Sequence, residues 1–521
     1  MSSTLDGAPV VTAEVLDRLR EVVGAHEVYT EADDLVRYRD PFWVVGDDTY
    51  AGAAVVRPAG TEQVQQIVRI ANEFGVPVWT LGQGRNNGYG GSSPRLAGSI
   101  QISTERMNRV LEINEKLAYA VVEPGVRFFD LYEALKAGGH RLRMAVPDLG
   151  WGSVTGNAMD NGIQYMPLAS NHGTVAGLEV VLPDGELLRT NMGAVPGSTA
   201  WHTYKRSMGP SLDALFTQSN LGIVTRMGVW LQRTPEAYQT LILGVEKDGD
   251  LDQAIDTVRE LMLDGTLQGV PSMYPAPRNG ALLLDLPVPP PTVWTEEALD
   301  AYAAETGIGR WAVRVGLWED REVLEYKSAK IKRIWGELPG ARIKEGPVYT
   351  PEQYDSITGQ TERVHIGAPT LQLNELTPEH IGHAGFAPVI PLDGAEIKAA
   401  ITKMRARAEE HGILLSGAIM AISPRAAAVV LGLQFDRRDE AAVRNVFALV
   451  HELIMELGAE GYGEYRAHID TMDDAADQYS FNDHAYRRFV EKIKDAVDPN
   501  GVLSPGRHGT WPAKYRKVRD R

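Results

Sequence analysis

Near the start of the chain a predicted strand runs directly into a glycine-rich turn, and this combination narrows the choice of fold more than any other feature. Strands are predicted over 51–57 and 76–81, with a helix over 61–74 between them. The turn from Leu81 to Gly91 holds five glycines. Glycines let successive backbone N–H groups approach and surround a phosphate. The sequence therefore predicts a βαβ-like unit that ends in an anion-binding loop.

This loop differs from the two common phosphate-binding motifs. No Gly-Lys-Ser/Thr follows it, which excludes a Walker loop. No long helix opens directly after it, as a Rossmann fingerprint would require. Because a glycine-rich loop alone also occurs as a surface turn, its interpretation depends on the rest of the chain.

The pattern of predicted elements changes twice along the chain. Strands and helices alternate densely up to residue 233. Within this stretch, Pro183-Asp184-Gly185 indicates a hairpin turn. Longer helices dominate from Thr234 to residue 458, and the tail returns to turn-rich sequence. We therefore expect an α+β protein with a cofactor domain over 1–233, a second α+β domain over 234–458 and a returning tail over 459–521.

Composition and charge argue against several classes of partner. The formal net charge of −17 is unfavourable for nucleic acid and for an anionic membrane surface. The absence of cysteine excludes disulfides, thiolate metal sites and cysteinyl cofactor links, and we expect no metal site. The chain has neither a run of about 20 apolar residues nor a signal-peptide pattern at its start. These features predict a cytoplasmic protein without nucleic-acid or membrane partners.

Four further motifs follow the glycine-rich loop in a fixed order. They are Val146–Asn157, Thr217–Thr225, Gly461–His468 and Asp498–Arg507. Each alone could be structural, and Asp498-Pro499-Asn500-Gly501 is interpreted as a turn. Together, over essentially the whole chain, the motifs resemble the vanillyl-alcohol oxidase and p-cresol methylhydroxylase family of 4-phenol-oxidising flavoenzymes, especially its bacterial eugenol oxidases. The strongest matches are Arg85–Gly91, Pro147–Gly150, Gly463–Arg466 and Asp498–Gly501.

The resemblance implies a two-domain fold of the vanillyl-alcohol oxidase type. An FAD domain and an α+β cap domain would enclose the flavin ring, and the C-terminal tail would return to the FAD domain. The FAD pyrophosphate would be held by the loop residues Gln83, Gly84, Arg85, Asn86, Asn87 and Gly88. Further positions that match FAD contacts are Pro147, Asp148, Ser153, Asn157, Ile223 and Arg507.

The resemblance also implies that FAD is attached covalently to His383. This residue opens the family motif His-x-x-Phe-x-Pro, which ends at Pro388. The cytochrome-linked cresol enzymes use a tyrosine upstream of this motif, where this chain has Glu375. Relatives carry a second, assisting histidine near the segment that corresponds to 39–43, and this chain has none there.

Four residues match the family's catalytic positions. Tyr89, Tyr465 and Arg466 match the trio that binds the phenolate, where two hydroxyl donors and a guanidinium lower the pKa of the phenol. Asp148 matches the carboxylate beside flavin N5, which stabilises a quinone methide or acts as a base. His468, which follows the trio closely in the sequence, is interpreted as structural, as is Asp470.

The reaction implied is oxidation of 4-alkylphenols or 4-hydroxybenzylic alcohols, guaiacyl and syringyl compounds from lignin included. Hydride would pass from the side-chain α-carbon to flavin N5, with O2 as acceptor, in a homodimer or higher homo-oligomer. Three alternatives stay open: a dehydrogenase that passes electrons to a cytochrome or other carrier, a flavin-binding protein without catalysis, and a sugar or hydroxyacid oxidase. A wide substrate cavity is expected because small residues replace larger ones at Thr377, Ala387, Ala427 and Ala428.

Overall fold

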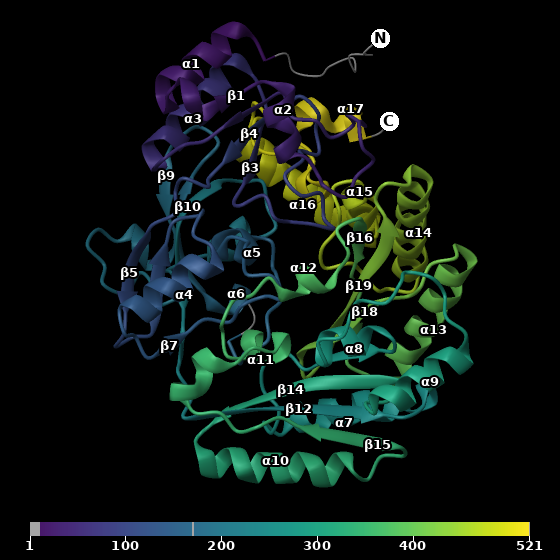
Figure 1. The fold of residues 1–521 in the computed structure, drawn as a ribbon. Coiled ribbons are helices and arrows are strands. Elements are labelled where there is room, and N and C mark those ends of the chain that lie inside the picture. The colour runs from purple at the N-terminus through teal and green to yellow at the C-terminus, as the bar shows by residue number, and fades with distance from the viewer. Residues whose placement is uncertain (1–10, 169–170, 520–521) are drawn as a thin grey trace.

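The structure is a computed structural model that describes residues 11–168 and 171–519. Figure 1 shows an upper part, formed by the first part of the chain and its C-terminal segment, and a lower part formed by the middle of the chain. The first helix, α1 (Ala13–Val23), and the last, α17 (Arg516–Arg519), lie at the same upper end. No helix in the described ranges is long and apolar enough to cross a membrane.

The predicted βαβ unit forms a four-stranded sheet in the order β1-β2-β4-β3, in which β2, β4 and β3 run parallel. The strands are β1 (Val28–Tyr29), β2 (Ala54–Val56), β3 (Val78–Leu81) and β4 (Ile100–Ser103). Helix α3 (Thr61–Phe74) connects β2 to β3 and buries Val64, Ile67 and Val68, as its periodicity predicts. It ends at Gly75, whose left-handed backbone (φ +64°) suits glycine. The glycine-rich turn therefore begins at the carboxyl end of β3.

A second, antiparallel sheet completes the upper part in the order β5-β6-β10-β8-β9. Its strands are β5 (Val110–Asn114), β6 (Tyr119–Val122), β8 (Val175–Val181), β9 (Leu187–Arg189) and β10 (Ile223–Trp230). Pro183–Gly185 makes the predicted hairpin between β8 and β9, since the Gly185 N–H donates to the Leu182 carbonyl. Helices α4 (Phe128–Ala137) and α5 (Val154–Met159) lie between β6 and β8 in the chain.

The lower part, here called the cap, is built on an eight-stranded antiparallel sheet in the order β15-β12-β14-β13-β18-β19-β16, with β17 paired to β19. Its strands are β12 (Ala237–Val245), β13 (Ser272–Pro275), β14 (Trp311–Glu319), β15 (Ala341–Glu345), β16 (Ile381–Phe386), β17 (Val389–Pro391), β18 (Gly417–Ser423) and β19 (Ala426–Asp436). All lie inside the segment 234–458 predicted for this domain, whose limits themselves stay a prediction.

Alternate side chains of the cap sheet face two different layers. Leu243 and Ile419 pack in one core with the helices α7 (Leu251–Leu263), α10 (Arg321–Trp335), α13 (Gly394–Glu410) and α14 (Glu440–Ala459). Their neighbours Ile242 and Met420 belong to a second core, shared with the five-stranded sheet. One face of the cap sheet is therefore covered by helices, and the other closes on the upper part (Figure 1).

The C-terminal tail returns to the first sheet. After α15 (Met472–Asp477) and α16 (Phe481–Val497), the Val78 N–H donates to the Val502 carbonyl at 2.8 Å. The turn predicted at 498–501 is present, since the Gly501 N–H donates to the Asp498 carbonyl at 3.0 Å. A fully buried ion pair between Lys494 and Asp498 (2.7 Å) fixes this turn to α16. The tail thus packs against the first sheet.

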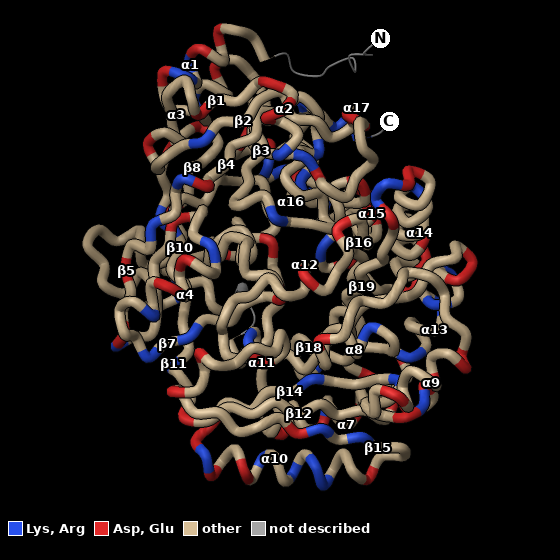
Figure 2. The backbone as a smooth tube through the Cα atoms, in the orientation of Figure 1, with Lys and Arg blue, Asp and Glu red and all other residues tan. Residues whose placement is uncertain are grey.

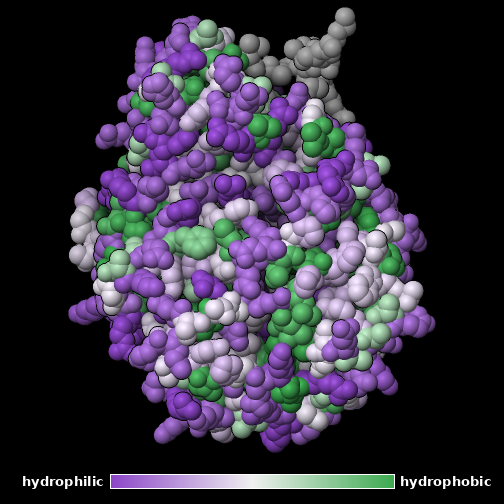
Figure 3. All heavy atoms as spheres, viewed as in Figure 1, coloured by the Kyte–Doolittle hydropathy of each residue, from purple (hydrophilic) through white to green (hydrophobic). Residues whose placement is uncertain are grey.

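The surface mixes charges of both signs. Figure 2 shows acidic and basic residues spread over both parts and alternating along α10. The face in Figure 3 is mainly hydrophilic, with a group of apolar side chains near the middle of its lower half. On this side of the molecule the net charge of −17 is therefore spread out and not gathered on one element.

The remaining helices are short. They are α2 (Ala32–Leu35), α6 (Asn171–Thr174), α8 (Arg278–Leu283), α9 (Glu296–Thr306), α11 (Gln360–His365) and α12 (Gln372–Leu376). Of these, α8, α11 and α12 lie where the cap meets the upper part (Figure 1).

Candidate active site

The glycine-rich loop folds back onto β16 of the cap. The Gly385 N–H donates to the Gly88 carbonyl at 3.0 Å. A Cβ at Gly88 would lie 2.6 Å from the imidazole of His383, and the backbone there is left-handed (φ +82°). Position 88 therefore requires glycine for its conformation and for the close approach of His383.

Free backbone donors follow this loop along a groove of about 120 Å³. In the described ranges, the N–H groups of Gly84, Arg85 and Asn86 donate to no acceptor. Converging free N–H groups in a glycine-rich concavity bind anions. The residues therefore fit the pyrophosphate of FAD. Of the predicted FAD-contacting residues, the groove is lined by Gln83, Gly84, Arg85, Asn86, Ser153, Asn157 and Arg507.

The other predicted FAD-contacting residues do not line this groove: Asn87, Gly88, Pro147, Asp148, Ile223 and His383. Ile223 is 2% exposed and packs in the core beneath the small sheet with Val181 and Val502. Asp148 and His383 lie where the cap closes on the loop, as described below.

Tyr89, Tyr465 and Arg466 come together although 375 residues separate the first two of them in the chain. The Arg466 guanidinium lies 4.2 Å from the centre of the Tyr89 ring. Burial raises the pKa of Tyr89 well above its usual value, with Tyr465 adding to the effect, and burial also raises the pKa of Tyr465. Both tyrosines therefore stay protonated and keep an O–H to donate.

Asp160, at the end of α5, holds Arg466 in place, and the sequence analysis missed it. The Asp160 Oδ2 lies 2.7 Å from the Arg466 Nε, and His508 pairs with the other oxygen at 3.3 Å. Burial opposes ionisation of Asp160, but Arg466 and His508 outweigh it and hold the pKa of this carboxyl below its usual range. Arg466 also donates to the Asn86 side chain. Asp160 lies beyond the matched motif that ends at Asn157, so no sequence signal marked it.

Asp148 is held by residues from both parts of the molecule. The Arg314 Nη2 donates to its carboxylate at 3.2 Å, and the Tyr165 hydroxyl donates to the other oxygen. Arg314 is fully buried on β14, with its guanidinium 3.8 Å from the centre of the Tyr165 ring. Gln360 donates to the Asp148 carbonyl at 3.1 Å. Sequence reasoning missed Arg314, although a single charge inside the apolar run 311–318 was an available signal.

His383 lies on β16 against the loop, with an edge contact to Phe42 (5.0 Å between ring centres). Burial and the nearby charge of Arg278 lower the pKa of His383 to about 4. The imidazole is therefore neutral near pH 7, which leaves a nitrogen lone pair available to form a bond. Phe42 lies beside His383 in the segment 39–43, where the relatives carry their assisting histidine.

The histidine and aspartate interpreted as structural are engaged elsewhere. His468 pairs with Asp40 at 2.8 Å, and both side chains are almost fully buried. Asp470 pairs with His451 at 2.9 Å and accepts a hydrogen bond from Tyr50. These contacts agree with the structural role predicted for them.

One part of the wide-cavity expectation was wrong. Ala427 packs in the core between the cap sheet and its helices, so its small size cannot widen a substrate cavity. Ala428 and Ala387 are fully buried, and the Thr377 hydroxyl donates to the Leu373 carbonyl. The alternation of side chains along β19 places Ala428 on the opposite face from Ala427.

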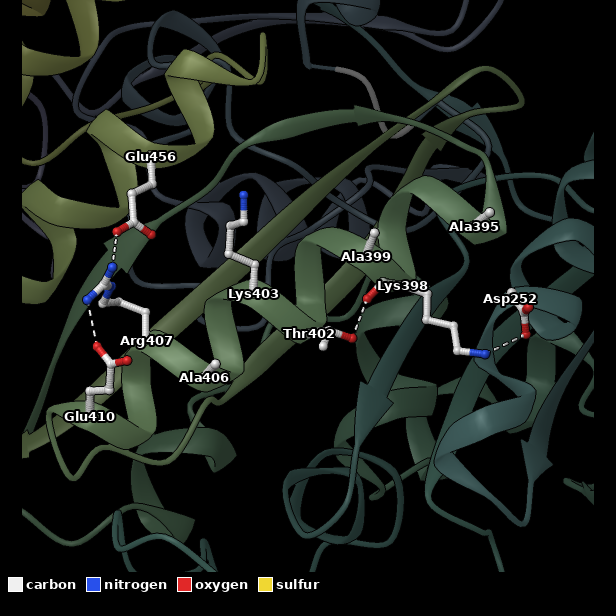
Figure 4. A pocket seen from close by; sticks show the side chains of 10 residues that line it. All are labelled: Asp252, Ala395, Lys398, Ala399, Thr402, Lys403, Ala406, Arg407, Glu410 and Glu456. Atoms are coloured by element: carbon white, nitrogen blue, oxygen red, sulfur yellow. Dashed lines mark hydrogen bonds and ion pairs between the residues drawn. The ribbon is translucent and has the colours of Figure 1, made fainter.

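An open surface groove of about 870 Å³ lies on the helical side of the cap. Figure 4 shows it along α13, with Lys398 pointing to Asp252 and Arg407 between Glu410 and Glu456. None of the predicted site residues lines it. The site between the loop, the tail and the cap is therefore identified by the chemistry of its residues and not by the volume of a groove.

Comparisons with known proteins show which proteins this chain is similar to. The family model described as FAD binding domain matches residues 52–191. The chain is 30% identical over 506 residues to the 4-cresol dehydrogenase [hydroxylating] flavoprotein subunit of Pseudomonas putida, covering 95% of each chain. It is 29% identical to 1'-carboxy-chondrochloren decarboxylase of Chondromyces crocatus, covering 95% of this chain and 98% of that protein.

Two solved structures match over nearly the whole chain. The isoeugenol complex of 4-ethylphenol oxidase from Gulosibacter chungangensis superposes with a TM-score of 0.91 at 37% identity, covering 97% of this chain and 99% of the other. Substrate-bound p-cresol methylhydroxylase superposes with a TM-score of 0.87 at 28% identity, covering 96% of each.

Proposed function

This chain belongs to the vanillyl-alcohol oxidase and p-cresol methylhydroxylase family of FAD-dependent, phenol-oxidising flavoproteins, and from this premise we propose that it oxidises para-substituted phenols at the side-chain carbon next to the ring. The predicted α+β fold class, the FAD cofactor and the flavin-dependent oxidoreductase class are confirmed. The substrate, the acceptor and the role of each residue are parts of the proposal.

FAD, when bound, supplies the acceptor for two electrons and a proton. The free N–H groups of Gly84, Arg85 and Asn86 would bind its pyrophosphate, and Ser153 and Arg507 line the same groove. His383 presents a neutral imidazole at the cap side, and we propose that it carries the covalent link to FAD.

The joint position of Tyr89, Tyr465 and Arg466 is the observation that carries the proposal. A guanidinium 4.2 Å from the centre of the Tyr89 ring, together with two protonated hydroxyls, forms a binding site for a phenolate oxygen. Hydrogen bonds and an opposite charge stabilise the phenolate and lower the pKa of the bound phenol. The phenolate then pushes electron density through the ring, which weakens the C–H bond at the para side chain. A sugar or hydroxyacid has no phenolic oxygen for this trio to bind.

Asp148 would act at the other end of the substrate. Its ion pair with Arg314 and its hydrogen bond from Tyr165 fix the orientation of the carboxylate. A fixed carboxylate can stabilise positive charge that develops at the α-carbon, or accept a proton from water or from an α-hydroxyl group.

We propose O2 as the electron acceptor. Identity is higher to 4-ethylphenol oxidase (37%) than to p-cresol methylhydroxylase (28%), and Glu375 stands where the cytochrome-linked enzymes carry their flavin-linking tyrosine. The likeness to a 4-cresol dehydrogenase favours the alternative, a dehydrogenase that passes electrons to a cytochrome or other carrier. A cytoplasmic homodimer or higher homo-oligomer is part of the same proposal.

An aerobic assay tests the substrate class and the acceptor together. Holoenzyme is mixed with 4-ethylphenol, vanillyl alcohol and syringyl alcohol, and hydrogen peroxide is compared with the phenol consumed. Equal amounts of peroxide and oxidised phenol are expected. Turnover only with an added dye acceptor would favour the dehydrogenase, and no oxidation of any para-substituted phenol would refute the proposed function.

A further inference from the structure

Two arginines and one carboxylate lie near one another where the cap meets the upper part: Arg314, which is fully buried, Arg278, which is partly buried, and Asp148. Arg314 pairs with Asp148 at 3.2 Å. Arg278, the first residue of α8, forms no hydrogen bond and no ion pair with any residue in the described ranges, and its Nη1 is buried without a partner. This group of residues therefore holds two positive charges and one negative charge.

Helix α8, which begins at Arg278, packs on α11: the Thr361 hydroxyl donates to the Leu282 carbonyl at 2.7 Å, and Gln360 of α11 donates to the Asp148 carbonyl at 3.1 Å. Burial lowers the pKa of Arg278, while Tyr274 and Asp148 are near enough to oppose that effect. The charge of Arg278 in turn helps to lower the pKa of His383. Arg278 does not line the groove assigned to the FAD pyrophosphate. The unpaired guanidinium thus lies near Asp148, whose carboxylate is assigned to the α-carbon.

Strand β16 runs from the end of the site near Arg278 to the end that would bind the phenolate. His383 and Gly385 point to the same face of the strand, because side chains alternate along it, and they lie roughly 7 Å apart. The charge of Arg278 acts on His383, whereas a Cβ at Gly385 would lie 2.6 Å from the Tyr89 ring. The two ends are separated by a distance comparable with the length of a para-substituted benzene ring.

The charge balance differs between the phenolate end of the site, at Arg466, and the α-carbon end, at Arg278. Arg466 has Asp160 as its counter-ion at 2.7 Å, but Arg278 has no counter-ion of its own among the described residues. An isolated buried charge is strongly unfavourable, and a bound anion removes that cost. Arginine with free N–H groups binds carboxylates through paired, charge-assisted hydrogen bonds.

We propose that Arg278 binds a carboxylate on the para side chain of the substrate, so that the preferred substrates are phenols with an anionic side chain. This inference rests on the proposed function, because it assumes that the phenol is oriented by Tyr89, Tyr465 and Arg466. Arg278 is then a residue that determines specificity, and neutral 4-alkylphenols are the poorer ligands.

The test uses two ligands that differ in charge and cannot react. 4-Hydroxyphenylglyoxylate and 4-hydroxyphenylglyoxylamide have no hydrogen on the α-carbon, so they bind to oxidised holoenzyme without turnover. Their Kd values are measured from the change in the flavin absorption spectrum. The wild-type protein should bind the acid at least about tenfold more tightly than the amide.

Three variants assign the preference to Arg278. Arg278→Met should bind both ligands with the Kd of the wild-type amide complex, and Arg278→Lys should keep part of the preference. Arg310→Met is the matched control, because it removes another buried cap arginine that is already paired with Glu296 and Asp300. It should keep the full preference. Arg278→Met should retain FAD and melt at a temperature no lower than the wild type, since the charge it removes has no partner.

Two results would overturn the inference. The first is equal affinity of the wild-type protein for the acid and the amide. The second is an equal loss of affinity for the acid and the amide in Arg278→Met, which would assign the arginine to FAD binding or to packing. Oxidation of 4-ethylphenol is measured separately. Phenol oxidation without a preference for the acid would refute this inference alone. A preference that depends on Arg278 without oxidation of any phenol would refute the proposed function and leave the anion site standing.

Discussion

Among single residues, Asp160 shows how a site depends on groups that do not touch the substrate. It pairs with Arg466 at 2.7 Å while Arg466 lies over the Tyr89 ring. Without this carboxylate the guanidinium loses its orientation and the local positive charge increases. We therefore propose Asp160 as a positioning residue for the phenolate site.

Replacing Asp160 by asparagine tests this role. We expect Asp160→Asn to keep its flavin spectrum but to lose about 10- to 100-fold in kcat/KM for 4-ethylphenol, the usual cost of losing a buried charged partner. Binding of a non-reacting phenol should weaken in parallel, and Asp160→Glu should recover part of both. Wild-type phenol binding in Asp160→Asn would contradict the role.

We propose that His383 carries the covalent link to FAD. Its neutral imidazole beside Gly88 predicts that acid-precipitated protein stays yellow and that the band fluoresces in a denaturing gel. In His383→Ala the flavin should be released on denaturation. Release of all flavin from the wild-type protein would contradict the covalent link.

Between elements, two ion-pair clusters attach the C-terminal tail to the rest of the molecule. Lys494 on α16 donates to the carbonyls of Asn220 and Leu503 and pairs with Asp498, all in the interior. His451 on α14 bridges Asp470 and Asp474 at the start of α15. Since Tyr465 and Arg466 lie on the segment between α14 and α15, these clusters also hold the phenolate site.

Lys494→Met should destabilise the protein by about 3–5 kcal/mol, because it leaves the carboxylate of Asp498 buried without its counter-ion. The free energy of unfolding from urea denaturation measures this loss. Lys514→Met removes an exposed lysine that also donates to a backbone carbonyl, and serves as the control. A similar small loss in both variants would contradict the importance of the buried pair.

His451 gives stability a defined dependence on pH. Hydrogen bonds to Asp470 and Asp474 raise its pKa from 6.5 to about 10. A raised pKa in the folded state means that the stabilisation is complete below pH 6.5 and is lost as the pH rises towards 10. Because the pair is partly exposed, we expect no more than about 1 kcal/mol. The difference in melting temperature between wild type and His451→Gln should shrink from pH 6 to pH 10, and a constant difference would contradict this.

For the molecule as a whole, local sequence patterns predicted the fold class, but they did not predict which residues of the cap and of the upper part come together. Glycines, periodic helices and hairpin signals act over short stretches, so α3, the loop and the turn at Asp498 could be predicted. Arg314 contacts Asp148, and Arg278 lies near it, only because the cap sheet closes on the upper part, and nothing near these arginines in the sequence records that closure. Ala427 was misjudged for the same reason, since its strand has two buried faces and the sequence does not say which one faces the substrate.

The most direct test of phenol activation is anaerobic reduction of the flavin, because it does not depend on the electron acceptor. Oxidised holoenzyme is mixed with 4-ethylphenol or with its methyl ether, 4-ethylanisole, and the flavin absorbance is followed in time. We predict rapid bleaching by the phenol, and bleaching slower by at least about 10²-fold with the ether and in Arg466→Ala. Equal bleaching by the methyl ether, or no bleaching by 4-ethylphenol and the other para-substituted phenols, would contradict the proposal that Tyr89, Tyr465 and Arg466 activate a phenolate.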